Sequence, residues 1–186
     1  MLITEYQEKW AGDFSKIKEI IDSALAGLEY SIEHIGSTAV PGLAAKPIID
    51  IDIVFSKTVV FDELKKRLEQ IGYYHNGNQG IPDREVFKRN GDSRNDRVLD
   101  FIQHHLYACP DSSEELKRHI LFRNYLIANK EARKEYELLK KNIAEEAMQD
   151  RKKYAILKES KARSFIEGAI EMERTQGDLH KSNNRS

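Results

Sequence analysis

The chain has 186 residues, of which 40% are hydrophobic and 33% charged, a composition typical of one globular domain with a sizeable core. Its 30 Lys and Arg balance 31 Asp and Glu, so the net charge of −1 excludes a general electrostatic attraction to nucleic acid or an anionic membrane. No apolar run approaches the ~20 residues of a membrane span, and the N-terminus lacks the apolar core of a signal peptide. The single cysteine, Cys109, excludes an intramolecular disulfide, so we expect a buried thiol and a cytoplasmic location.

The first predicted elements are a helix and a short strand that leads into a glycine turn. Apolar residues recur at helical spacing over residues 5–28, and a β-like run follows at 30–35. Gly36 then allows backbone to approach a ligand closely, and Ser37 and Thr38 add two hydroxyls beside exposed amides. This turn predicts a phosphate cradle. It is not a Walker A loop, because Lys46 stands in Ala-Lys-Pro and no Gly-x-x-x-x-Gly-Lys-Ser/Thr pattern exists.

The most informative stretch is an apolar, β-branched run at residues 48–55 that contains two aspartates. It predicts a buried strand with Asp50, Asp52 and Val54 on one face and with the isoleucines and Phe55 on the other. The two carboxylates are then about 7 Å apart at their Cα atoms, within reach of one cation or a close pair. Since burying charge is costly unless it is paired or metal-bound, the strand predicts a hard cation such as Mg²⁺.

A Gly-Ser turn followed by Asp-x-Asp on a strand resembles the polymerase-β-like nucleotidyltransferases, whose turn holds triphosphate and whose aspartates hold Mg²⁺. More specifically, residues 34–51 (HIGSTAVPGLAAKPIIDI) resemble the signature of the GrpB family, proteins with a predicted nucleotidyltransferase fold and a poorly defined biochemical role. Further segments resemble the family in the same order over residues 1–170. One departure is His105-Leu106-Tyr107, where the family pattern reads His-Leu-His.

Residues 61–71 predict a second amphipathic helix, which ends at Gly72. Residues 72–96 are rich in turn formers, with a short strand expected at 84–89. Arg84, Lys88 and Arg89 are weak candidates for phosphate contacts, and only the first two match the family pattern.

A strand is expected at residues 97–109, where two candidates compete for the third position of the site. Asp100 is the third carboxylate that this chemistry favours, whereas the resemblance favours His105, and strand alternation points the two to opposite faces. Alternation also places His105 and Tyr107 together, so we expect His105 to face Asp50 and Asp52 and Asp100 to lie away. A histidine ligand would make Mn²⁺ or Zn²⁺ alternatives to Mg²⁺. A purely structural strand histidine with a hydrogen-bond partner remains the alternative for His105 and for His34, and it is the better explanation of His104.

The chain is predicted to be helical from Ser112 onward, with a cap at Ser112 or Ser113, a helix at 131–148 and a last helix at 160–174. The order of these elements predicts an α/β or α+β fold, and the resemblance implies α+β with a nucleotidyltransferase-like mixed β-sheet flanked by helices. A single domain is expected over 1–175, helical from about 112, with a disordered tail at 176–186. Arg123 is the preferred phosphate-binding arginine in this half, ahead of Arg118 and Lys140, while either Lys158 or Lys161 matches a family lysine.

These features lead to two functional hypotheses. The first is a metal-dependent nucleotidyltransferase or nucleotide-binding protein, which transfers a nucleotidyl group from an NTP to an unknown acceptor. The second is a catalytically silent scaffold that binds a protein partner or small ligand, with a resemblance-based link to coenzyme A metabolism. No kinase P-loop exists in the chain. The predicted site comprises catalytic and metal-binding Asp50, Asp52 and His105, and phosphate-binding Gly36, Ser37, Thr38, Lys46 and Arg123.

Overall fold

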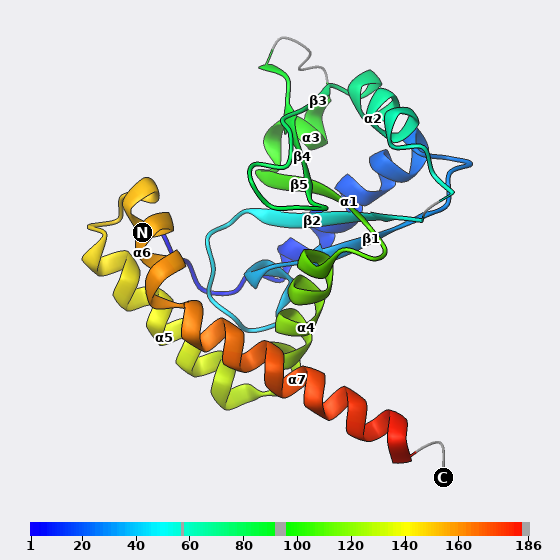
Figure 1. Ribbon diagram of the computed structural model, residues 1–186. Helices are drawn as coiled ribbons and strands as arrows, with labels where there is room; N and C mark the ends of the chain where they lie inside the picture. The colour runs from blue at the N-terminus through cyan, green and yellow to red at the C-terminus, as the bar shows by residue number, and fades with distance from the viewer. Residues whose placement is uncertain (57, 92–95, 184–186) are drawn as a thin grey trace.

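The computed structural model describes residues 1–56, 58–91 and 96–183, the last six of them by backbone only. A mixed five-stranded sheet with the order β1-β2-β5-β4-β3 forms its centre (Figure 1). The strands are β1 (Tyr30–Ile35), β2 (Ile49–Phe55), β3 (Tyr73–His75), β4 (Glu85–Arg89) and β5 (His104–Pro110). Only β2 and β5 pair in parallel, and the other pairs are antiparallel. The α+β class with a mixed sheet is thus confirmed.

Helices lie on both sides of this sheet, and on one side further helices form an additional layer (Figure 1). They are α1 (Lys9–Ala24), α2 (Phe61–Gln70), α3 (Arg97–Phe101), α4 (Glu114–Ala128), α5 (Lys130–Glu146), α6 (Arg151–Lys161) and α7 (Arg163–Asn183). Within the described ranges, no helix is both long enough and apolar enough to cross a lipid bilayer.

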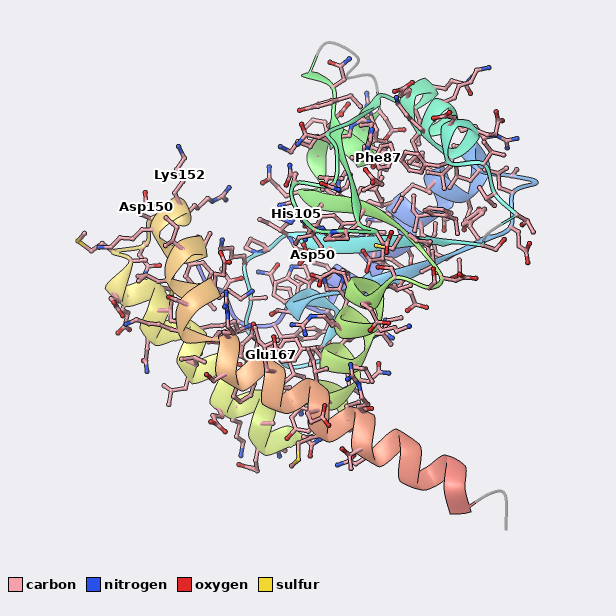
Figure 2. All side chains as sticks on the ribbon, in the orientation of Figure 1. Asp50, Phe87, His105, Asp150, Lys152 and Glu167 are labelled. Carbon is pink, nitrogen blue, oxygen red and sulfur yellow. The ribbon has the colours of Figure 1, made fainter. Side chains whose placement is uncertain are left out.

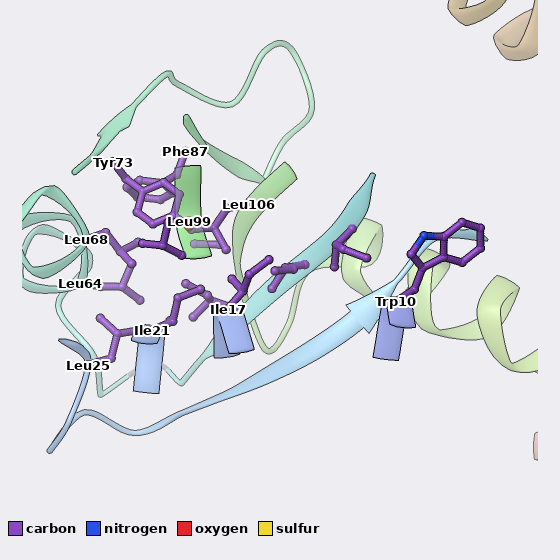
Figure 3. Packing of buried hydrophobic residues seen from close by; sticks show 14 of the residues in the cluster. Trp10, Ile17, Ile21, Leu25, Leu64, Leu68, Tyr73, Phe87, Leu99 and Leu106 are labelled. Carbon is purple, nitrogen blue, oxygen red and sulfur yellow. The ribbon is translucent and has the colours of Figure 1, made fainter. Parts of the chain in front are cut away.

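The main hydrophobic core lies between the sheet and helices α1 to α3. Ile49, Ile51 and Ile53 of β2 are at most 1% exposed and pack in the same cluster as Ile17 and Ile21 of α1. Figure 3 shows these α1 side chains together with leucines of α2 and the aromatic residues of β3 and β4. The alternation of β2 is therefore confirmed, because its isoleucines face this core and its aspartates face the other side.

A second core holds the helical layer against the segment that follows the glycine turn. Val40, Leu43 and Ala44 pack there with side chains of α4 to α7 and with Ile3. The backbone N–H of Ala44 also donates to Glu137 Oε2 of α5 at 3.0 Å. The aspartate face of β2 consequently looks toward the space between the two cores.

The expected strand at residues 97–109 is wrong in its first half. Residues 97–101 form the short helix α3, and β5 begins only at His104. The reason is local, since the Asp96 side chain accepts hydrogen bonds from the backbone N–H groups of Val98 and Leu99, both at 2.8 Å. This cap satisfies two backbone N–H groups at the start of the helix, which in a strand would need acceptors on a neighbouring strand.

The C-terminal helices also differ from the prediction. The expected helix at 160–174 corresponds to α7, which begins at Arg163, and the helix α6 at Arg151–Lys161, which ends just before the buried Ala162, was not predicted. Helix α7 continues to Asn183 through most of the expected tail, because low apolar content does not by itself prevent a helix and residues 176–183 contain no proline to end it. Residues 184–186 of that expected tail, and 92–95 of the turn-rich segment, lie outside the described residues.

Ile17→Ala tests the dependence of the fold on the α1 core. Ile17 is fully buried, so the lost contacts and the resulting cavity should lower the free energy of unfolding by about 2–5 kcal/mol. Urea unfolding monitored by circular dichroism measures the change. Lys16→Ala, at the exposed neighbouring position, should alter stability by less than about 0.5 kcal/mol. Equal effects of the two changes would contradict this packing.

Candidate functional site

The glycine turn is built to bring backbone against Asp50. Ile35, the last residue of β1, pairs with Asp50 across the sheet, and Gly36 follows at φ 71°, in the region that favours glycine. A Cβ atom on Gly36 would lie 2.4 Å from Asp50 Oδ2, closer than two such atoms approach. Only glycine therefore allows the turn and the carboxylate to be this close.

Asp50 and His105 form the exposed part of the site. They are direct partners in the parallel ladder of β2 and β5, and His105 Nδ1 lies 2.8 Å from Asp50 Oδ1 (Figure 2). A carboxylate oxygen at this distance requires a proton on Nδ1, so in the neutral ring Nε2 carries the lone pair. The His105 side chain is 54% exposed, which leaves Nε2 accessible to a ligand. The expectation that His105 faces Asp50 is confirmed.

Asp52 is fully buried and is held by a histidine that the sequence analysis missed. His119 Nδ1 of α4 lies 2.8 Å from Asp52 Oδ2, and His119 Nε2 lies 3.3 Å from Glu115 Oε1 one turn earlier. Burial alone would lower the pKa of His119, but the hydrogen bonds to Asp52 and Glu115 outweigh it and raise the pKa to about 9. His119 is therefore an imidazolium at neutral pH. The i, i+4 spacing of Glu115 and His119 in the sequence could have indicated that the two side chains share a helix face, but it could not have indicated that His119 binds Asp52.

Asp100 lies away from this site, as expected. Its Oδ1 accepts hydrogen bonds from Arg89 Nη2 at 2.7 Å and Nε at 3.0 Å, and its Oδ2 accepts one from the backbone N–H of Asp96. His34 also has a structural role: its ring stacks on Phe14, and burial lowers its pKa to about 4. Neither residue is available as a third ligand beside Asp50.

A cavity of ≈ 540 Å³ opens between the two cores, in front of Asp50 and His105. Basic, acidic and aromatic side chains from several elements line it. Among them are Gly36, Ser37, Thr38, Lys46, Asp50, Arg84, His105, Tyr107, Glu115, Arg118, His119, Phe122, Tyr136, Lys140, Tyr154, Lys158 and Glu159. The structure thus gathers the glycine turn, the Asp-x-Asp strand and β5 around one space.

Lys140 connects the helical layer to the glycine turn. It is 1% exposed, and its Nζ donates to Ser37 Oγ at 3.1 Å and to the carbonyl oxygen of Ala44. Burial, reinforced by the nearby charge of Lys158, holds the pKa of Lys140 well below that of an ordinary lysine. An anion entering the cavity here would favour the charged form of the amine. Lys161, in contrast, pairs with Glu146, so Lys158 is the lysine at the cavity.

Not every predicted phosphate ligand reaches the cavity. Arg123 Nη1 donates to Glu33 Oε2 at 2.7 Å and to the carbonyl oxygen of His34 at 2.9 Å, and Arg123 is not among the lining residues. Thr38 does line the cavity, but its hydroxyl is already engaged with His34 Nε2 and with the carbonyl oxygen of Ile48. We therefore keep Gly36, Ser37 and Lys46 as phosphate candidates, add Lys140, and assign Arg123 to the α4–β1 contact.

The predicted metal ligands do not converge as a set of three. Among the described residues, no group of three or more His, Cys, Asp or Glu side chains is arranged to hold a metal ion. Asp52 Oδ2 is hydrogen-bonded to His119, and Asp50 Oδ1 is hydrogen-bonded to His105. Asp50 lines the cavity, and within the described part of the chain no hydrogen bond to its Oδ2 is found. This donor fits Mg²⁺, which is often held by one or two carboxylates together with substrate phosphates and water.

Comparison with known proteins identifies close relatives. The family model described as "GrpB protein" matches residues 1–168. The chain is 36% identical over 155 residues to the glutamate-rich protein GrpB of Alkalihalophilus pseudofirmus, covering 83% of this chain and 87% of that protein. It is 35% identical over 139 residues to the UPF0157 protein YqkA of Bacillus subtilis, covering 75% of this chain but only 38% of that longer protein.

Solved structures agree with this relationship and extend it to the fold. The crystal structure of conserved protein GrpB from Enterococcus faecalis has a TM-score of 0.75 and 31% identity, covering 91% of this chain and 98% of that one. A mutant of the Cid1 poly(U) polymerase bound to MgATP has a TM-score of 0.56 at 12% identity, covering 83% of this chain and 50% of that one. This second likeness shows a nucleotidyltransferase-like fold.

Gly36→Ala tests the contact between the turn and Asp50. Gly36 and Gly42 both have positive φ, but a Cβ on Gly42 would meet no atom within 4 Å, so Gly42→Ala carries only the backbone strain, about 1 kcal/mol. Gly36→Ala should lower the free energy of unfolding by at least about 1 kcal/mol more. In a double-mutant cycle measured by urea unfolding, Asp50→Ala should remove most of this excess, because it deletes the carboxylate and leaves only the Cβ atom at 3.1 Å. An unchanged excess would show that Asp50 is not the clashing group.

The raised pKa of His119 predicts a pH-dependent stability. Its pKa of about 9 in the folded protein exceeds the ordinary 6.5, so its contribution is complete below pH 6.5 and is lost as the pH rises through 9. Compared with His119→Gln, the wild type should be more stable by on the order of 3 kcal/mol at pH 6 and by little at pH 10. Urea unfolding of both proteins between pH 6 and 10 measures the difference. A difference that does not vary with pH would contradict the Asp52–His119 ion pair.

Proposed function

This chain belongs to the GrpB family, and on that premise we propose that its cavity binds a nucleoside triphosphate and supports transfer of the nucleotidyl group to an acceptor. The observation that carries the proposal is the meeting of three features at one cavity: the Gly36-Ser37 turn, the buried Lys140, and the Asp50–His105 pair. A reducing cytoplasm is the proposed location, consistent with the free and buried Cys109.

The phosphate end of the ligand is assigned to the turn and the helical layer. Ser37 presents a hydroxyl already bonded to Lys140, and Lys46 and Lys158 line the same cavity. Burial, and then the charges of Lys158 and Arg151, lower the pKa of Lys46 more than the nearby Asp50 raises it, so these cations lack sufficient balancing negative charge. Phosphate oxygens would supply that counter-charge. Aromatic side chains of the same cavity, Phe122 and Tyr154, offer apolar surface to the rest of the nucleotide.

A divalent cation, Mg²⁺ first and Mn²⁺ next, is proposed at Asp50. Asp50, which lines the cavity, would hold it together with phosphate oxygens of the ligand. When bound, such an ion offsets the negative charge that develops on the phosphates during transfer. Asp52 is left with a positioning role, because its charge is compensated by His119. Zn²⁺ is disfavoured, because the three predicted ligands do not converge.

The remaining steps belong to side chains of this chain. His105 Nε2 accepts the proton of the acceptor hydroxyl while Asp50 holds the ring through Nδ1. The acceptor oxygen then attacks the α-phosphorus, and the bond to the pyrophosphate oxygen breaks. Gly36 and Ser37 amides together with Lys140 hold the departing pyrophosphate. Burial, followed by the charge of Asp50, raises the pKa of the neighbouring Tyr107, so this phenol stays neutral and takes no proton.

A catalytically silent scaffold is the second candidate, and one observation favours it. The Asp52 carboxylate is paired with His119, and the Asp100 carboxylate is paired with Arg89. Of these three candidate aspartates, only Asp50 therefore offers a carboxylate oxygen to a ligand. A protein of this kind would bind a nucleotide, coenzyme A or a protein partner without turnover.

Ligand binding should depend on a divalent cation. ATP, GTP, CTP, UTP and coenzyme A are compared by thermal unfolding, each with and without Mg²⁺ or Mn²⁺. At 100 times its Kd, the preferred triphosphate should stabilise the protein by about 2.7 kcal/mol, and only with the cation, because Asp50 otherwise repels the phosphates. In Asp50→Asn, stabilisation by the triphosphate should no longer depend on the cation. In the control Asp62→Asn, on the exposed start of α2, it should depend on the cation as in the wild type.

Turnover separates the two candidates. Pyrophosphate release from the bound triphosphate, in the presence of candidate acceptors, supports the transferase, and His105→Gln should then lower the rate at least tenfold without weakening triphosphate binding. Binding without pyrophosphate release would favour the scaffold. No stabilisation by any of the five compounds would reject nucleotide binding itself.

A further inference from the structure

Arg84 is a cation of the cavity that the proposed chemistry leaves unused. It directly precedes β4, whose Val86 pairs with Tyr107 of β5. The Arg84 guanidinium carbon lies 4.9 Å from the centroid of the Tyr107 ring, and both residues line the cavity. Tyr107 is in turn the ladder partner of Asp52. Arg84 is thus fixed over an aromatic platform on the aspartate face of the sheet.

Arg84 differs from the arginines around it, because no carboxylate among the described residues pairs with its guanidinium. Arg118 makes two hydrogen bonds to Glu167, Arg123 binds Glu33, and Arg89 binds Asp100. For Arg84, no ion pair within 4.0 Å is found in the described part of the chain, and its Nε is buried without a hydrogen-bond partner. Buried polar groups without partners are uncommon and often mark a place where a ligand completes the bonding.

The position of Arg84 separates it from the phosphate end of the cavity. In the sheet order β1-β2-β5-β4-β3, Ser37 follows β1 on one side of Asp50, whereas Arg84 precedes β4 on the other side, beyond β5. Asp50 and His105 lie between them on β2 and β5. A group held at Arg84 would therefore approach the reacting centre from the side opposite to the triphosphate.

We propose that Arg84, held on the Tyr107 ring, forms a second anion subsite that binds a phosphate monoester group of the acceptor. A planar guanidinium presents paired N–H donors that match two phosphate oxygens, and its stacked position limits the rearrangement needed on binding. The acceptor is then a small phosphorylated molecule that carries a hydroxyl group. That the bound molecule is the acceptor rests on the proposed function, whereas the binding of an anion at Arg84 does not.

Charge neutralisation within the protein is the competing explanation for Arg84. The nearby carboxylates, however, have partners of their own: Asp50 binds His105, Asp52 binds His119, and Glu115 contacts both His119 and Arg118. A purely structural Arg84 would change stability on substitution, but it would not bind one anion selectively.

Titration calorimetry on the full chain tests the subsite with two probes, inorganic phosphate and tripolyphosphate, the latter with Mg²⁺. Phosphate should still bind the wild type when tripolyphosphate is saturating. Arg84→Gln should weaken phosphate binding at least tenfold and change tripolyphosphate binding less than twofold. Ser37→Ala should do the reverse. Lys88→Gln, which removes the same charge from an exposed position of β4 outside the cavity, should change neither.

Arg84→Lys covers the case in which Arg84→Gln fails to fold. It keeps the charge but loses the paired donors, so phosphate binding should weaken severalfold while tripolyphosphate binding is retained. The proposal is overturned if phosphate does not bind the wild type beside tripolyphosphate, if Arg84 substitutions weaken both probes equally or neither, or if acetate binds more tightly than phosphate. Arg84-dependent phosphate binding in a protein that binds no triphosphate would reject the proposed function and leave the subsite standing.

Discussion

The buried ion pair between Asp52 and His119 is the constraint on which the arrangement of this protein depends. Asp52 sits in β2 between β1 and β5 at 0% exposure, and a carboxylate there would be strongly destabilising without a partner. The partner comes from α4, 67 residues later in the sequence. Because α4 packs against α5 and α7, the position of His119 also determines where the whole helical layer lies relative to the sheet. Together with the contacts of Arg123 to Glu33 and of Lys140 to Ser37, this pair joins the helical layer to the sheet beside the cavity.

The same pair separates the roles of two aspartates that look equivalent in the sequence. Asp50 and Asp52 share a face of β2, but only Asp50 reaches the cavity, beside the glycine turn and the exposed His105. Asp52 has its charge balanced by an imidazolium and its position fixed by the sheet. A buried charged pair of this kind adds little net stability compared with apolar packing, so its retention is better explained by positioning than by stability.

The sequence predicted well those features that short-range physics determines. Alternation in β2, the glycine turn and the pairing of Asp50 with His105 all follow from strand periodicity and from the steric freedom of one residue. Alternation failed at 97–101, where a side-chain cap from Asp96 stabilises a helix instead. His119 and Arg123 were beyond reach for a different reason. Their roles depend on contacts 67 and 90 residues away in the chain, and helix periodicity gives no information on such partners.

Burial of the Lys140 amine disfavours its charged form in the free protein, and the same amine is placed to bind an anion in the cavity. Its amine has two neutral oxygen acceptors, from Ser37 and Ala44, and no carboxylate within salt-bridge distance among the described residues. Burial therefore disfavours its charged form, and a phosphate group placed beside Ser37 would reverse that preference. Residues that break local rules of packing and charge balance are most often found at functional sites. Lys140 and Arg84 both break them, on opposite sides of Asp50, which is the arrangement expected of a cavity that holds two anionic groups around one reacting centre.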